Sequence, residues 1–289
     1  MKKIRFIINP VSGFGKHKIT ESIINEHLDI SSFYYEIFYT KAPGHASELC
    51  KDAVSQRFDI VAAVGGDGSV NEIGKQLTGS ETAMAIIPTG SGNGLARHLN
   101  IPIDLYKSIG IINNLNIKKI DTCSVNSETF ISMAGVGFDA HIAYKFSKSG
   151  KRGFWSYLKL CLIEYINYEV QDYYLNIDGN TMNIKAFFIC CANSSQHGNN
   201  AVIAPQAIID DGYIDVCIIK KFPAYMVPVL IYRVFNKTIE KSACLEIRRC
   251  KEVTIKQNST LVHLDGEPLN LGKELNVKIN PLSLKVIVP

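Results

Sequence analysis

The stretch "VAAVGGDGSVNEIG", residues 61–74, decides how the first half of the chain folds. Its apolar beginning belongs to the run "DIVAAVG" (59–65), which predicts a strand buried on both faces. Two glycines, an aspartate and a third glycine follow, and a helical pattern begins near Ser69. A parallel strand that ends in glycines just before a helix is typical of a sheet edge that binds a ligand.

Strands and helices alternate on both sides of this stretch. Strands are expected at "IRFIIN" near the N-terminus, at 34–40, 59–65 and 83–88, and helices at 16–28, 44–56, 69–78, 91–99 and 104–114. The nearly continuous apolar content of the strands predicts an α/β domain, a parallel sheet with helices on both faces.

The pattern changes after about residue 121. Strand-like runs then follow one another at 120–126, 129–134, 172–178, 184–192, 213–219, 245–249, 252–257, 261–265, 274–279 and 284–288. Helical patterns are confined to 138–147, 154–168 and 223–235. This indicates a second, mostly antiparallel β domain, so we predict domains at 1–121 and 122–289.

Composition excludes several classes of protein. The net charge of +4 and the absence of a Lys/Arg run argue against a nucleic-acid partner. No apolar run approaches the ~18 residues of a membrane span, and "MKKIRFIINP" is too short in apolar residues for a signal peptide. The eight scattered cysteines contain no C-x-x-C pair, which indicates reduced core residues and a cytoplasmic location.

Three strand ends carry loops rich in glycine and other turn residues: "NPVSGFGK", "GGDGSVNE" and "PTGSGNGLAR". Backbone N–H groups in such loops can converge on an anion, and the helices that follow add favourable dipoles. The three loops together predict a nucleotide phosphate site, although no Walker loop is present. Asp67 would repel phosphate unless Mg²⁺ lies between them, and it has the alternative role of a helix cap.

A second glycine motif lies in "SMAGVGFDAH", where Gly135, Gly137 and Ala140 loosely match a dinucleotide fingerprint. It falls in the β-rich half, and Glu164, at about the distance of the expected acid, lies in a helical pattern. We expect a tight turn between a strand and a helix here.

The ordered set "NPVSG", "GGDGSVNE" and "PTGSGNGLA" resembles the diacylglycerol kinase catalytic-domain family, which includes bacterial soluble lipid kinases and sphingosine kinases. The resemblance continues through "AGVGFDA" (134–140), "IAPQAIIDDGYIDV" (203–216) and "HLDGEP" (263–268), and so spans essentially the whole chain. It implies an N-terminal domain similar to those of NAD kinases and phosphofructokinases, a C-terminal β-sandwich, and an active site in the cleft between them.

The resemblance also implies roles for particular residues. Asp67 would be an essential acid near Mg²⁺, and the ATP-binding residues would be Asn9, Ser12, Gly13, Thr40, Gly65, Gly66, Asp67, Gly68, Ser69, Val70, Asn71 and Ser91. Ser69 and Ser91 stand where the family often has threonine and keep its hydroxyl. Asn93-Gly94 replaces a common Asn-Asp, so the role of that second acid is absent here.

In the second half, the resemblance makes Glu267 the general base, with Asp265 as the close alternative. The Asp-Gly pair is also a strong hairpin signal, and both roles can hold. Asp211, with the carbonyls of Ile208 and Tyr213, would bind a structural magnesium ion, although "DDG" is equally an ordinary turn. Asp121 and Asp139 are further candidates for the cleft.

These features predict a kinase that uses ATP and Mg²⁺ to phosphorylate a hydroxyl of a lipid such as diacylglycerol or a sphingoid base. The alternatives are an NAD kinase-like enzyme and a non-catalytic, nucleotide-binding regulator at the membrane. Residues 145–157 are expected to contact the membrane surface through basic and aromatic side chains, among them Lys145, Lys148, Lys151, Arg152, Phe154 and Trp155. Residues 158–166 are expected to pack on the sandwich, and the oligomeric state is left open between a monomer and a homodimer.

Overall fold

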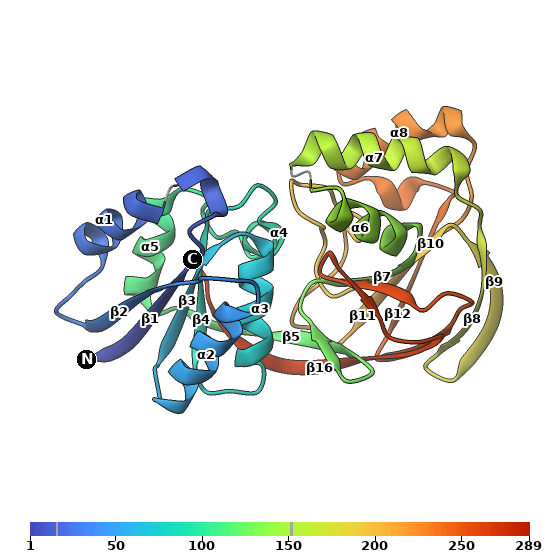
Figure 1. Cartoon of the computed structure of the whole chain (residues 1–289). Helices are drawn as coiled ribbons and strands as arrows, with labels where there is room; N and C mark the ends of the chain where they lie inside the picture. Colours follow the sequence, from blue (N-terminus) through green and yellow to red (C-terminus); the bar gives the residue numbers. More distant parts are fainter. Residues whose placement is uncertain (16, 151–152) are drawn as a thin grey trace. The chain divides into compact units, whose positions relative to one another are not determined.

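A computed structural model describes residues 1–15, 17–150 and 153–289, which form two compact units (Figure 1). The first unit contains residues 1–120 and 282–289, and the second contains 121–281. The boundaries drawn from the sequence differ from these mainly at the C-terminus, because the last eight residues pack with the first unit.

The first unit is an α/β domain whose strands pair in the order β2-β1-β3-β4, all parallel. The end of β16 joins beside β4, with Val286 opposite Met84. Helices α2 and α3 pack together on one face of the sheet, and α1 and α5 on the other (Figure 1). The elements are β1 (Lys2–Ile8), η1 (Ser12–Gly15), α1 (His17–His27), β2 (Phe33–Tyr39), α2 (His45–Ser55), β3 (Ile60–Gly65), α3 (Asp67–Leu77), β4 (Ala83–Pro88), α4 (Gly94–His98) and α5 (Leu105–Asn114).

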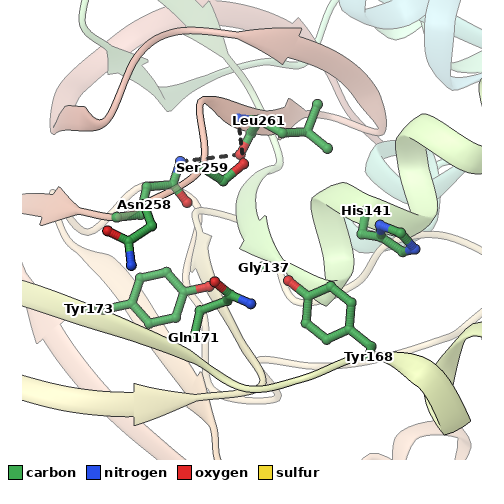
Figure 2. Close-up of a pocket in the computed structure, with 9 residues that line it drawn as sticks. Gly137, His141, Tyr168, Gln171, Tyr173, Asn258, Ser259 and Leu261 are labelled. Carbon is green, nitrogen blue, oxygen red and sulfur yellow. Dashed lines mark hydrogen bonds between the residues drawn. The ribbon is translucent and has the colours of Figure 1, made fainter.

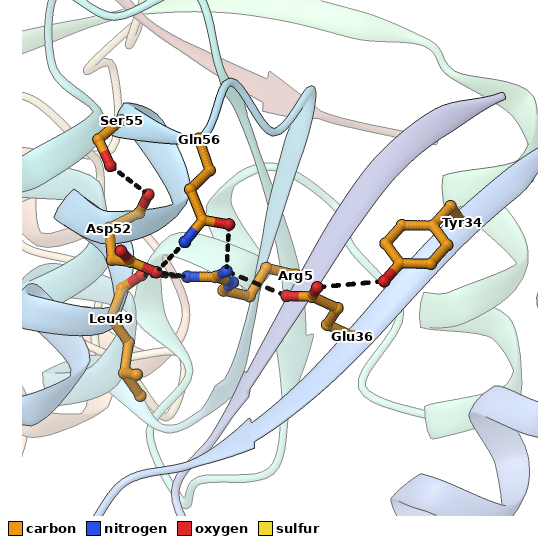
Figure 3. Close-up of polar contacts among 7 residues, drawn as sticks. All are labelled: Arg5, Tyr34, Glu36, Leu49, Asp52, Ser55 and Gln56. Carbon is orange, nitrogen blue, oxygen red and sulfur yellow. Dashed lines mark hydrogen bonds and ion pairs between the residues drawn. The ribbon is translucent and has the colours of Figure 1, made fainter.

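Every residue of β3 and β4 is buried, as the continuous apolar runs predicted. β1 carries a buried cation, Arg5, whose side chain is 2% exposed. Its guanidinium donates to Glu36 on β2 and to Asp52 on α2 (Figure 3). It also lies over the rings of Phe38 and Phe58. The paired carboxylates and the two aromatic faces compensate the burial of this charge.

The second unit is a β-sandwich of two mainly antiparallel sheets, as predicted. One sheet has the order β12-β11-β10-β7-β14-β15, and the other contains β16-β13-β8-β9. Its core draws buried side chains from both sheets. The strands are β5 (Ile117–Val125), β6 (Glu128–Phe130), β7 (Met133–Gly137), β8 (Gln171–Ile177), β9 (Asn180–Ala186), β10 (Phe188–Ala192), β11 (Ile214–Ile219), β12 (Leu245–Cys250), β13 (Glu252–Lys256), β14 (Leu261–Leu264), β15 (Glu267–Asn270) and β16 (Glu274–Ile287).

The sheet containing β10 is also covered on its other face, by helices α6 (Phe138–Lys148), α7 (Phe154–Asn167) and α8 (Val227–Phe235) (Figure 1). The short helices η2 (Ala224–Met226) and η3 (Ile239–Lys241) flank α8. The adjacent Cys190 and Cys191 point to opposite faces of β10, one beneath the helices and the other into the sandwich. All eight cysteines are free thiols, and burial raises the pKa of these two well above its usual value.

Candidate active site

In the first unit, the three glycine loops meet at the carboxyl edge of the sheet. Asn9 follows β1 and donates a hydrogen bond from its amide to the hydroxyl of Ser69, at 3.2 Å. The hydroxyls of Ser12 and Thr89 lie 2.7 Å apart. Thr40 follows β2, where its N–H donates to the carbonyl of Ile8 at 2.9 Å. Parallel strands end at one edge, so loops far apart in sequence become neighbours.

The glycines allow two of these loops to touch. A Cβ placed on Gly90 would lie 2.5 Å from the Cα of Gly66, so the loops after β3 and β4 pack backbone against backbone. A Cβ on Gly65 would lie 2.4 Å from the hydroxyl oxygen of Ser69. Gly68 is different, because a Cβ there meets no atom within 4 Å. The protein itself therefore leaves the space beside Gly68 open.

Asp67 links the same two loops. Its carboxylate accepts hydrogen bonds from the N–H groups of Asn93, at 2.8 Å, and Gly94, at 2.6 Å. These amides form the N-terminus of α4, where a negative charge is favoured. The helix that Asp67 serves in this way is α4, whereas its own helix, α3, has Gly66 as N-cap. Asp67 is half-buried.

The other residues expected to bind ATP differ from one another in exposure and backbone conformation. Gly13 adopts the left-handed conformation, with φ of 63°, and Ser91 is exposed at the tip of its loop. Val70 and Asn71 are buried side chains of α3.

Two further residues organise the loops and were not predicted from the sequence. One is Thr89, which meets Ser12, and the other is Arg97 of α4, whose Nε donates to the carbonyl of Gly92 at 3.1 Å. The position of Arg97 directly after the glycine-rich turn is the feature of the sequence that could have indicated its contact with that turn.

In the second unit, Glu267 begins β15 directly after a tight turn. Asp265 and Gly266, with φ of 50° and 86°, form the turn between β14 and β15, as the Asp-Gly signal predicted. Glu267 is exposed. The carboxylate of Asp265 instead accepts three backbone N–H groups, those of residues 131–133, at 2.7 to 2.9 Å. Asp265 thus fastens the turn to the segment that leads into β7, and the role of Glu267 as general base stays a prediction.

The carboxylate of Asp211 lies in an ion pair with Arg249 and accepts the N–H of Tyr213 at 3.0 Å. The Arg249 guanidinium also lies over the Tyr213 ring. A magnesium ion would have to displace a cation already bound there, so the donor set does not fit a metal well, and the magnesium role of Asp211, Ile208 and Tyr213 stays a prediction. Asp121 is buried and accepts the N–H of Gly212 at 2.7 Å.

The glycines of "AGVGFDA" have packing roles. A Cβ on Gly135 would lie 2.3 Å from Nε2 of His263 and 2.5 Å from Oδ2 of Asp139. Gly137, with φ of 80°, ends β7, and a Cβ there would lie 2.5 Å from the hydroxyl oxygen of Tyr173. The motif is the tight strand-to-helix turn that we expected, and its glycines make room for buried polar side chains.

An apolar pocket lies beneath the helices of the second unit. Its lining contains residues of α6, α7, α8 and β10, including Phe138, Ile142, Leu158, Phe187, Leu230 and Val234. The lining also contains a carboxylate, that of Asp139, and an imidazole, that of His197. An apolar pocket with a small polar region suits an amphiphile better than a nucleoside.

A smaller pocket on the same unit has a more polar lining (Figure 2). Tyr168 and Tyr173 lie on one side, and the chain from Asn258 to Leu261 lies on the other, with the Ser259 hydroxyl accepting the N–H of Leu261 at 3.0 Å. This pocket contains none of the predicted site residues.

Glycine loops at the edge of a parallel sheet, together with a separate β-sandwich, define a class of two-domain kinases. Residues 3–125 match the family described as "Diacylglycerol kinase catalytic domain". Residues 132–288 match the "YegS C-terminal NAD kinase beta sandwich-like domain". The chain therefore belongs to the diacylglycerol kinase catalytic-domain family of lipid kinases, with a YegS-type C-terminal domain.

Relatives and solved structures agree with this membership. The chain is 28% identical over 232 residues to a Chromohalobacter salexigens protein named "Probable lipid kinase YegS-like", covering 78% of this chain and 75% of that one. It is 28% identical over 228 residues to a Bacillus subtilis protein named "Diacylglycerol kinase", covering 76% and 75%. The structure of a diacylglycerol kinase from Bacillus anthracis has the same fold, with a TM-score of 0.78, 20% identity and coverage of 100% and 97%.

Proposed function

We propose that the protein transfers the γ-phosphoryl group of ATP to a hydroxyl of a lipid. The observation that carries the lipid assignment is the apolar pocket beneath α6, α7 and α8. A kinase whose acceptor is a nucleotide such as NAD has no use for a pocket with this lining. The acyl or sphingoid chain of the acceptor would occupy it.

The glycine loops would hold the phosphates. Helix α3 begins directly after β3 at this sheet edge, and the open space beside Gly68, in its first turn, allows close approach of an anion. Asp67 keeps the loops after β3 and β4 together through the Asn93 and Gly94 amides. Its carboxylate would lie near the Mg²⁺ that ATP brings, and the cation would offset the repulsion between carboxylate and phosphate.

Glu267 would act as the general base. The acceptor oxygen forms a bond to the γ-phosphorus, the bond from that phosphorus to the bridging oxygen of ADP breaks, and the hydroxyl proton passes to Glu267. The position of Glu267 on the exposed side of the tight turn supports this role. The carboxylate of Asp265 accepts three backbone N–H groups, which suits a structural role. The prediction that this reaction takes place between the two domains stays a prediction.

We further propose that the outer face of α7 contacts the membrane surface. Trp155 and Ile166 are each 79% exposed on this helix, and Leu162 and Ile163 are about half exposed. Its other face packs on the sandwich through residues such as Leu160 and Cys161, as expected for 158–166. Two of the basic residues named for this role, Lys151 and Arg152, lie outside the described residues. Among the helices that the structure describes, none is long and apolar enough to cross a bilayer.

The test is a phosphoryl-transfer assay with γ-labelled ATP, Mg²⁺ and detergent-dispersed acceptors. The acceptors are diacylglycerol, monoacylglycerol, a sphingoid base, phosphatidylglycerol and NAD. We expect label in one lipid, and its loss in both Asp67→Ala and Glu267→Gln. Label in NAD alone would identify an NAD kinase-like enzyme. Binding of ATP without transfer to any acceptor would favour the non-catalytic regulator.

A further inference from the structure

Beneath the turn that presents Glu267 lies a buried histidine, His263, which is 1% exposed. It is the third residue of β14, and its Nδ1 accepts the N–H of Gly266 at 3.2 Å. Gly266 directly precedes Glu267. The buried imidazole is therefore hydrogen-bonded to the backbone of the turn at the residue next to the proposed base.

The proton on the ring is assigned by the same hydrogen bond. Because Nδ1 accepts the Gly266 N–H, it carries no proton, and the proton of the neutral ring lies on Nε2. Nε2 lies 2.8 Å from Oδ2 of Asp139, to which it donates. Asp139 is on α6, so a carboxylate from a helix fixes the tautomer of a strand histidine.

The fold makes room for this pair. Gly135 on β7 lies opposite His263 in the sheet, and a Cβ there would overlap both partners of the hydrogen bond. A glycine whose Cβ would exclude this buried hydrogen bond indicates that the sequence requires the contact. Asp139, Cys190 and His197 each place one atom that could bind a metal within 4.8 Å of the other two. The Asp139 carboxylate, however, is already hydrogen-bonded to His263.

We infer that His263 is a positioning residue for Glu267, held by Asp139 in the tautomer whose Nδ1 accepts the Gly266 N–H. This inference rests on the proposed function, since it assigns Glu267 as the base. Asp139 does not touch the turn, and it acts only through the imidazole.

Protonation of His263 would undo this arrangement. The second proton must go to Nδ1, which would then face the N–H of Gly266, one donor against another. The groups that face His263 are Asp139 on α6, His197 at 3.8 Å from the same Asp139 oxygen, and Asp265 in the turn. Burial acts to lower the pKa of His263, but Asp139 and Asp265 outweigh it and raise this pKa. Burial acts to raise the pKa of Asp139, yet the two histidines lower it to about 2.

Four variants of the full chain distinguish a role of His263 in positioning Glu267 from a role in the stability of the protein alone. His263→Ala removes the acceptor, and His263→Asn places a non-titrating carbonyl oxygen near the position of Nδ1. Asp139→Asn keeps a hydrogen-bond acceptor for Nε2 but removes the charge. His141→Asn is the matched control, because His141 lies on the same helix as Asp139 and forms another histidine–carboxylate pair, with Glu164 of α7 at 2.7 Å.

We expect His263→Ala to lower kcat by up to about 100-fold with an unchanged KM for ATP, the cost of misplacing a catalytic group by about 1 Å. His263→Asn should recover much of kcat and lose the acid limb of the pH profile that His263 causes. Asp139→Asn should shift that limb to lower pH, because the carboxylate that raises the His263 pKa is gone. The control should match the wild type.

NMR of protein carrying ¹⁵N-labelled histidine and glycine gives a readout independent of activity. The expected result is a proton on Nε2 of His263 at neutral pH, and a shift of the Gly266 amide when the ring protonates. A proton on Nδ1, or a wild-type kcat in His263→Ala beside an inactive Glu267→Gln, would overturn the inference while the proposed function stands. If the wild type phosphorylates no acceptor, the proposed function fails and the positioning role with it, whereas the NMR result still decides whether His263 holds the turn.

Discussion

At the residue scale, glycines that look alike in sequence have different reasons to be there. Gly66 and Gly90 are required by contact between two backbones, and Gly135 by a buried hydrogen bond. Gly68 has no such requirement within the protein, since a Cβ there meets no atom within 4 Å and its φ is not positive. In the proposed function, a phosphate that approaches the backbone accounts for glycine at this position.

We therefore expect Gly68→Ala to weaken ATP binding without loss of stability. Alanine in a helix is favoured over glycine by about 0.5–1 kcal/mol, so the variant should be as stable as the wild type or more so. Gly110→Ala is the control, because Gly110 is also helical and its Cβ also meets open space, but it lies on α5. Nucleotide titration and urea unfolding of both variants give the test, and equal ATP affinity in the two would contradict it.

Gly135→Ala, unlike Gly68→Ala, should lower the stability of the protein. Its methyl group would be forced against Nε2 of His263 and Oδ2 of Asp139, so we expect a loss of about 1–3 kcal/mol, the usual cost of overpacking a core. The loss should be accompanied by a changed His263 tautomer or environment in the NMR spectrum. A variant that is as stable as Gly110→Ala, with an unchanged His263 signal, would show that the pair has more room than its geometry implies.

At the element scale, side chains that reach between elements fix how these pack. Arg5 joins β1 to β2 through Glu36 and to α2 through Asp52, and the Gln56 side chain also accepts from the guanidinium, at 3.3 Å (Figure 3). The hydrogen bond from Arg5 is the main cause that lowers the pKa of Asp52. The stabilisation that this contact gives to the packing of α2 should therefore depend on pH, because it requires the ionised Asp52 carboxylate.

Arg5→Met tests this link. The variant should unfold at lower temperature than the wild type at pH 6, because it leaves two carboxylates without their cation. A carboxylate with a lowered pKa in the folded state stabilises the protein above about pH 4, and the contribution is lost as the pH falls through the folded pKa. The difference in unfolding temperature should therefore narrow between pH 6 and pH 3. A difference that stays constant would exclude Asp52 as its source.

The second element-scale prediction concerns α7. Trp155→Glu and Ile166→Glu place charges on its exposed apolar face, and we expect both to reduce co-sedimentation with anionic vesicles. Tyr34→Glu is the control, because Tyr34 is a half-exposed aromatic residue of β2 in the first unit. If all three variants bind vesicles as the wild type does, the α7 face is not the membrane contact.

At the scale of the whole molecule, two strands belong to both units: β5, which crosses the boundary after Ile120, and β16. β16 runs from Glu274 to Ile287; its residues up to Pro281 belong to the sandwich, and those from Leu282 belong to the α/β unit. Leu284, Val286 and Ile287 are fully buried there. The first unit is thus discontinuous in sequence.

Removal of residues 282–289 should destabilise the first unit selectively. Each of the three buried side chains contributes about 1.5–3 kcal/mol by burial, so their joint loss is large against the stability of a typical domain. ATP binding should be lost, while the signals of the sandwich core persist. Leu282→Ala is the control, since Leu282 is half exposed. Retained ATP affinity in the truncated chain would contradict the prediction.

The sequence was most informative where a signal is local. Glycine loops, the Asp-Gly turn and the change from alternating to consecutive strands were all predicted, because each depends on neighbouring residues. The pairs that join distant segments were not: His263 and Asp139 are 124 positions apart, and Ser12 and Thr89 are 77 apart. β16 was expected as two strands, at 274–279 and 284–288, yet it is one strand that continues through the residues between them, with Leu282 at a φ of 49°.

The shared strand β16 has a consequence for synthesis. The ribosome makes residues 1–120 first, but the strand segment that completes their sheet emerges only about 160 residues later. At about 5–20 residues per second, the delay is roughly 8 to 30 seconds. During this interval the nascent α/β unit exposes the edge of β4, a template for wrong pairing. The sandwich can gather most of its strands before the nucleotide unit is complete, so the half of the protein that is translated first is the half that finishes folding last.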